Sequence, residues 1–294
     1  MAGERLLGRV TARGGERLLG WLVLAAVVAS AVMSLAVAPP DVEQRNAQRL
    51  MYVHVPAAWL AYLAFAVVFV ASAAYLVTGR WRWDRLAAAS AEVGVLFTAL
   101  TIVLGSIWGK PVWGTWWTWD PRLTTTAILL LIYVGYLAVR RLPNSPGRRA
   151  RWAAVVGIVG FLDVPIVHLS VTWWRGLHQG PSVRLLGAPT IAPVMLAALL
   201  VGVLAFTLLY LYLVTLRLRV GRLEERALAE ALSPRVGERP EVLLEARDIE
   251  ARGLEAVGAG DAPAEGRAGP AHGEAVAADR GTPGTAGPGV GSGG

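Results

Sequence analysis

Two histidines on either side of a tryptophan-rich segment could together bind a metal. His54 lies within Met51-Tyr-Val-His-Val-Pro-Ala-Ala58, and His178 lies within Trp173-Trp-Arg-Gly-Leu-His-Gln-Gly180. Two imidazoles from separate segments can coordinate the iron of a haem from its opposite faces. The two motifs therefore predict a bis-histidine site, provided that the fold brings them together.

Tryptophan is concentrated in the segment between these histidines. Five of the twelve tryptophans fall between residues 108 and 119, and four of these are Trp113, Trp116, Trp117 and Trp119. An interfacial belt needs only one or two such anchors per helix end. The density favours an apolar platform for a large planar ligand, and Gly109 and Gly114 would let the backbone approach it closely.

Asp120, Pro121 and Arg122 close the tryptophan-rich segment and open the next apolar stretch. Aspartate is a good helix N-cap and proline is favoured at the first helical position, so we expect Asp120 to cap a helix. Arg122 could pair with Asp120 or reach an acidic group of the ligand, such as a propionate.

The composition is that of a membrane protein. Hydrophobic residues make up 55% of the 294-residue chain and charged residues only 17%, against about 25% charged in soluble domains. Cysteine is absent, which excludes thiolate metal sites and covalent haem attachment through a Cys-x-x-Cys-His motif in this chain. No Walker loop or nucleophile–histidine–acid order is present in a suitable context, so we assign no catalytic residue.

Six apolar segments of about 20 residues predict an all-α, polytopic membrane protein with six transmembrane helices. They lie near residues 18–38, 54–78, 86–107, 123–140, 152–173 and 190–216. Arginine clusters precede the first segment, follow the last, and occupy alternate connectors. The positive-inside rule predicts that both termini are cytoplasmic, and that His54, His178 and the tryptophan-rich loop share the outer face.

This pattern divides the chain into four parts. Residues 1–17 form an N-terminal cytoplasmic arm, and residues 18–216 form the six-helix domain with its outer loop at 106–124. Residues 217–256 mix Glu, Arg, Leu and Ala, which favours a cytoplasmic amphipathic segment. Residues 257–294 are rich in Gly, Ala and Pro, which predicts a disordered tail.

Three ionisable residues fall inside the apolar segments, where they are costly. We expect His168 to be a buried polar residue bonded to a neighbouring helix, although a second haem ligand or a proton relay is the alternative. Asp163 lies near the middle of its segment and needs a partner or a proton. We place Glu92 nearer the cytoplasmic end.

The motifs around the tryptophan-rich loop resemble those of the WWD group of haem-handling proteins, and the two histidine motifs resemble those of its CcmC family. The resemblance covers residues 18–216 and implies a haem exporter or haem-lyase component of cytochrome c maturation system I. It implies that haem b is held non-covalently by His54 and His178 and is presented to the haem chaperone CcmE. Trp113, Trp116, Trp117, Trp119 and Asp120 would form the platform and docking surface.

The same resemblance implies a place and partners for the protein. CcmD and the ATP-driven CcmAB complex are the expected partners, and the bacterial inner membrane is the expected location, with the haem site facing the periplasm. A haem-transfer activity would follow, without a recognisable acid–base site. Three alternatives stay open: a CcsA- or CcmF-like haem synthase component, a membrane b-type haem electron carrier, and a secondary transporter that uses Asp163 and Glu92.

Overall fold

The computed structural model describes residues 2–178, 180 and 190–232, and its regular elements there are all helical. The α-helices are α1 (Ala2–Val32), α2 (Met51–Thr78), α3 (Trp81–Trp113), α4 (Pro121–Val139), α5 (Pro146–Phe161), α6 (Asp163–Trp173) and α7 (Pro193–Leu232). A π-helix, Met33–Val37, extends α1, and a 3-10 helix, Asn46–Leu50, leads into α2. The predicted tail at 257–294 lies outside the described residues.

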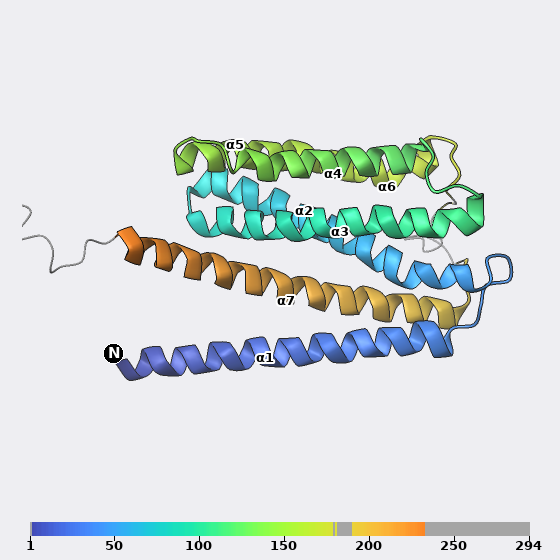
Figure 1. The fold of residues 1–294 in the computed structure, drawn as a ribbon, viewed down its shortest axis with the longest axis horizontal. Coiled ribbons are helices and arrows are strands. Elements are labelled where there is room, and N and C mark those ends of the chain that lie inside the picture. Colours follow the sequence, from blue (N-terminus) through green and yellow to red (C-terminus); the bar gives the residue numbers. More distant parts are fainter. Residues whose placement is uncertain (1, 179, 181–189, 233–294) are drawn as a thin grey trace, which may run out of the picture. The chain divides into compact units, whose positions relative to one another are not determined.

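Six helical segments are long and apolar enough to cross a membrane, as predicted. They run over Gly14–Val37, Asn46–Thr78, Trp81–Trp113, Pro121–Val139, Pro146–Trp173 and Pro193–Ala231. Figure 1 shows the connectors α2–α3 and α4–α5 at one end of the bundle, together with the end of α7. The tryptophan-rich connector between α3 and α4 lies at the other end, beside the end of α6.

At their C-terminal ends, two helices continue beyond the predicted limits of their segments. α3 runs on to Trp113, so the backbone of the expected loop is helical up to that residue. Gly114 ends the helix in the left-handed conformation (φ 76°), and its N–H donates to the Lys110 carbonyl at 3.0 Å. Glycine adopts this conformation without strain. α7 is continuous to Leu232, which joins the start of the predicted amphipathic segment to the sixth span.

Small residues on α2 let the neighbouring helices approach closely. Ala57, Ala61 and Ala64 are fully buried on this helix. Gly94 of α3 leaves room for the Phe65 ring, which stacks on Tyr133 of α4 with ring centroids 3.7 Å apart. Close backbone packing of this kind replaces the hydrophobic driving force that lipid does not provide between helices. α2 is consequently the centre of the core.

The fifth span, Pro146–Trp173, departs from α-helical hydrogen bonding at Leu162, where the N–H donates to the carbonyls of Val159 and Gly160, and its two halves pack differently. α5 packs against both α2 and α4, whereas α6 packs mainly against α4. Gly157 lets α5 pack closely against α2, since a Cβ there would lie 3.0 Å from the side chains of Ser72 and Val68 on α2. Beyond Leu162, α6 packs mainly on α4, and its contact with α2 includes the His168 ring against Tyr62.

Ion pairs join the helices at the end of the bundle away from the tryptophan-rich segment. Arg140 of α4 holds Asp84 of α3 through two hydrogen bonds of 2.6 and 2.8 Å. Arg217 of α7 pairs with Glu92 of α3, with one contact of 3.0 Å between Nη2 and Oε1. Glu92 is thus paired on the side of the bundle where the sequence placed it.

Candidate functional site

Two adjoining cavities lie at the end of the bundle that carries the tryptophan-rich segment. The first, the α4 cavity, has a volume of about 270 Å³ and is enclosed mainly by α2, α3 and α4. The second, the α7 cavity, has a volume of about 260 Å³ and is enclosed by α2, α3 and Leu199 of α7. Six residues line both cavities: His54, Val55, Gly105, Trp113, Arg122 and His178. The two cavities thus form a ligand-sized space with two lobes.

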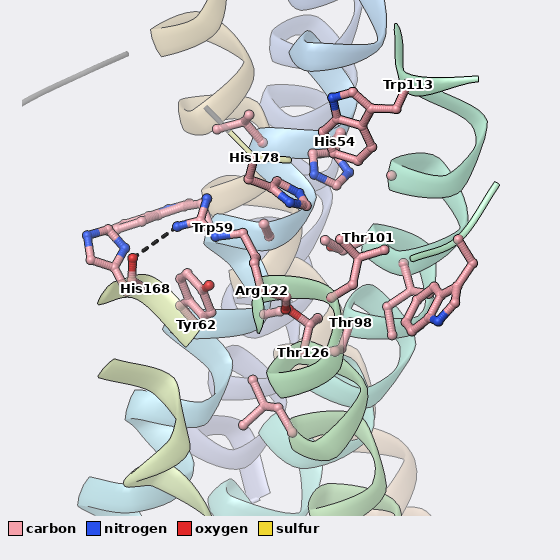
Figure 2. A pocket seen from close by; sticks show the side chains of 18 residues that line it. His54, Trp59, Tyr62, Thr98, Thr101, Trp113, Arg122, Thr126, His168 and His178 are labelled. Atoms are coloured by element: carbon pink, nitrogen blue, oxygen red, sulfur yellow. Dashed lines mark hydrogen bonds between the residues drawn. The ribbon is translucent and has the colours of Figure 1, made fainter. Parts of the chain in front are cut away.

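The fold brings together the two histidines that the sequence singled out. His54 lies in the first turn of α2, and His178 follows the end of α6. Both line each cavity, and Figure 2 shows their rings near each other beside Trp113. The Trp113 and His178 ring centroids are 4.7 Å apart in an edge-on contact.

Asp120 positions His178 through three hydrogen bonds. Its Oδ1 accepts from the backbone N–H of Arg122 at 2.9 Å, which makes Asp120 the N-cap of α4 as predicted. The same oxygen lies 3.1 Å from Nδ1 of His178, and Oδ2 accepts from the N–H of Leu177 at 2.7 Å. A carboxylate bonded to Nδ1–H selects the tautomer whose Nε2 is free to coordinate a metal.

The electrostatic balance at this contact keeps the imidazole neutral and the carboxylate charged. Burial lowers the pKa of the His178 imidazole, the Asp120 carboxylate opposes that shift, and Arg122 adds to it. Burial would raise the pKa of the Asp120 carboxyl, but the N–H groups of Arg122 and Leu177 and the His178 ring hold it below its usual value. A neutral imidazole beside an ionised carboxylate is the state that a metal requires.

His54 is held by packing and keeps one ring nitrogen unpaired. Its Nδ1 is buried and has no hydrogen-bond partner. The ring makes an edge-on contact with Trp108, with centroids 5.7 Å apart. Gly105 makes room for it, because a Cβ there would lie 3.0 Å from Cε1 of the imidazole. An unpaired buried nitrogen is costly unless a ligand occupies it.

The predicted tryptophan platform is divided between the cavities and the surface. Trp113 lines both cavities and Trp117 lines the α4 cavity. Trp116 and Trp119 are exposed and line neither, and 80% of the Trp119 side chain is accessible. Gly109 accommodates Trp113 itself, since a Cβ there would lie 3.1 Å from the Trp113 ring.

Arg122 and His168 meet at the edge of the α4 cavity. Nη2 of Arg122 donates to the His168 backbone carbonyl at 3.0 Å, the dashed line in Figure 2. Nε of Arg122 is buried without a partner, so this cation retains an unused donor in a wall shared by both cavities. The His168 side chain is exposed rather than buried as the sequence suggested, and it lines the α4 cavity.

Several lining residues did not stand out in the sequence. Thr98, Thr101 and Gly105 line the α4 cavity from α3. Their spacing of three and four residues places them on one helix face, a pattern that could have identified them. Tyr62 and Trp59 line the cavity from α2, but apolar neighbours hide them in the sequence. Asp163 lines neither cavity, and its Oδ2 is buried without a partner.

The comparison with known families decides the identity of this fold. The family model of CcmC, heme exporter protein C, matches residues 9–233. The chain belongs to the heme exporter protein C family. The match includes all six spans and both histidine motifs, and it confirms the resemblance seen in the sequence.

Similar proteins occur in bacteria and in a plant. Heme exporter protein C of Bradyrhizobium diazoefficiens is 41% identical over 216 residues, which are 72% of this chain and 82% of that protein. Heme exporter protein C of Escherichia coli is 39% identical over 68% of this chain and 81% of its own length. A putative cytochrome c biosynthesis ccmC-like mitochondrial protein of Arabidopsis thaliana is 35% identical over 74% of this chain and 82% of its own length.

Proposed function

We propose that this protein handles haem during the maturation of c-type cytochromes. It binds haem b non-covalently between His54 and His178 and delivers it to the haem chaperone CcmE. Membership of the heme exporter protein C family supports the general role. The observation that carries the specific site is the pair of imidazoles from separate segments that line the same two cavities.

The residues around the two cavities suit a haem. The His54 imidazole and Nε2 of His178 are available as nitrogen ligands, since both side chains line the two cavities. The macrocycle would then extend into the lobes on either side of the histidines, with Trp113 and Trp117 against its apolar surface. Arg122 offers an unused buried donor to a propionate. Bound haem would supply only its iron and its planar surface; the chain supplies position and charge.

Delivery requires a site that holds its cargo without enclosing it. Trp116 and Trp119 project from the loop beside the cavities and are free to contact another protein. Aromatic side chains with large exposed surfaces are enriched at protein contact sites. We therefore assign these two residues to the docking of CcmE and assign Trp113 and Trp117 to the haem. No residue of this chain is given the role of a general acid or base.

The proposed orientation in the membrane follows from the arrangement of the spans. We propose that both termini are cytoplasmic and that the cavities face the periplasm across the bacterial inner membrane, because arginine clusters mark the opposite end of the bundle. The proposed partners beside CcmE are CcmD and the CcmAB complex. The ion pairs of Asp84 and Glu92 then lie toward the cytoplasmic side.

Absorption spectroscopy tests the ligand assignment. The parent, His54→Ala, His178→Ala and His168→Ala proteins are each co-expressed with CcmE and purified. We expect a bis-histidine haem spectrum in the parent, a loss of at least tenfold in haem content in the first two variants, and parental content in His168→Ala. Loading of CcmE should fall with haem content. A parent without haem, or full spectra in both His54→Ala and His178→Ala, would contradict the proposal.

A further inference from the structure

The α4 cavity reaches well below the end of the bundle. Trp59 lies eight residues after the start of α2, and His168 lies five residues before the end of α6. At 1.5 Å per residue these positions are about 12 Å and about 8 Å along their helices from the outer end. Both residues line the cavity, so the cavity reaches the depth of the outer leaflet in the proposed orientation.

Among the described residues, the two halves of the fifth span cover this side of the cavity differently. Below Leu162, α5 fills the space between α2 and α4. Above it, α6 follows α4, and among the described residues α6 gives only His168 to the cavity lining. The Tyr62 and His168 rings make an edge-on contact with centroids 6.4 Å apart. On the other side of His168, its carbonyl accepts a hydrogen bond from Arg122 of α4.

Two of the residues at this gap are exposed although they lie within apolar spans. His168 is exposed, and 44% of the Trp59 side chain is accessible. Trp59 is held in place by a hydrogen bond of 3.1 Å from its indole Nε1 to Thr207 of α7. Figure 2 shows Trp59, Tyr62 and His168 on one side of the cavity and Thr98, Thr101 and Trp113 on the other. The cavity thus has a tryptophan, a tyrosine and a histidine where lipid would meet it.

We propose that the gap between α2 and α6, framed by Trp59, Tyr62 and His168, is a lateral portal through which haem enters the site from the outer leaflet. This inference rests on the proposed function. An amphiphilic planar molecule dissolved in lipid can present its flat surface to the aromatic frame. Its carboxylate end meets Arg122 of α4, whose bond to the His168 carbonyl joins α4 to α6 beside the portal and can be exchanged for one to the cargo.

A cross-linking test uses the absence of cysteine from the chain. The double variant Tyr62→Cys/His168→Cys is reconstituted without haem in phosphatidylcholine nanodiscs and joined with a short bis-maleimide. Ferric protoporphyrin IX is supplied in the lipid, and its uptake is followed by absorption. The control pair Gly20→Cys/Tyr212→Cys places the same linker between α1 and α7, where a Cβ on Gly20 would lie 3.5 Å from the Tyr212 ring.

We expect the linker across the portal to slow haem uptake at least tenfold relative to the same variant before linking, and to leave haem bound beforehand in place. The control linker should change uptake less than twofold. Equal uptake before and after linking of the portal would overturn the proposal. A parent protein that takes up no haem would instead refute the proposed function.

A second measurement uses the parent protein without substitution. It therefore still tests the proposal if the double variant fails to bind haem. The parent protein is placed in nanodiscs with increasing mole fractions of ferric protoporphyrin IX at constant aqueous haem. Entry through the portal predicts an initial rate proportional to the mole fraction in the lipid. A rate that follows only the aqueous concentration would exclude lateral entry.

Discussion

Both carboxylate oxygens of Asp120 accept backbone hydrogen bonds. Oδ1 accepts from the Arg122 N–H in the first turn of α4, and Oδ2 accepts from the Leu177 N–H in the segment after α6. Its bond to His178 Nδ1 adds an orienting role to the cap. Gly176 is part of the same arrangement, because a Cβ there would overlap the Asp120 carboxylate. The spacing of Gly176 and His178 in the motif therefore has a steric cause that the sequence alone does not reveal.

Asp120→Asn tests this orienting role. An amide that keeps its oxygen at the cap and at His178 sets its NH2 donor against the Leu177 N–H, and the flipped amide sets that donor against the Arg122 N–H and the His178 ring. We expect haem content to fall by about 10- to 100-fold, the usual effect of losing a carboxylate behind a ligating histidine. The measurement is haem titration followed by absorption. Asp163→Asn, a carboxylate outside both cavity linings, is the matched control and should bind like the parent.

Gly176→Ala perturbs the same carboxylate by sterics alone. The added methyl group must displace the Asp120 side chain, and with it the Leu177 bond. We expect weaker haem binding with little change in thermal stability, since Gly176 lies in a segment between helices. Gly147→Ala, where a Cβ has nothing within 4 Å, is the control. Parental haem affinity in Gly176→Ala would show that the carboxylate moves without consequence.

At the scale of elements, the six spans were predictable and their ends were not. Runs of about 20 apolar residues have few alternatives to a spanning helix. The end of α3 was misplaced because the predicted apolar segment ends near residue 107, whereas Gly114 is the residue that stops the helix. The interruption at Leu162 precedes Pro165, which has no N–H to donate to the Phe161 carbonyl four residues before it. It depends on how α5 and α6 pack on their neighbours.

The close packing of α5 against α2 and α4 gives a prediction at this scale. Gly157→Ala adds a methyl group 3.0 Å from Ser72 and Val68 and 3.2 Å from the Tyr136 ring, between two helices. Overpacking a core of this kind costs about 1–3 kcal/mol. We expect a lower melting temperature in detergent, measured by intrinsic fluorescence. Gly135→Ala on α4, where a Cβ meets nothing within 4 Å, carries the same change and should not destabilise the protein.

Across the whole molecule, charge and aromatic chemistry are segregated to opposite ends. One end has the histidines and the tryptophan-rich segment, and their pairing could be anticipated from the alternation of arginine-rich connectors. The two-lobed shape of the site could not, because it depends on side chains from α2, α3, α4 and α7 that are distant in sequence. The other end is joined by ion pairs, which fix the bundle that the site requires.

The most buried of these pairs should carry much of the stability of that end. Asp84 is 5% exposed and binds Arg140 through both oxygens, while Arg140 lies over the Tyr136 ring. Replacing Asp84 by Asn leaves a largely buried guanidinium without its counter-charge, at a cost of roughly 3–5 kcal/mol. Arg85→Gln removes a neighbouring but exposed pair with Glu225, worth about 0–1 kcal/mol. Thermal denaturation should therefore separate the two variants clearly, and equal melting temperatures would mean that the bundle does not depend on this ion pair. Because the pair lies at the end opposite the cavities, the folded fraction of Asp84→Asn should still bind haem with parental affinity.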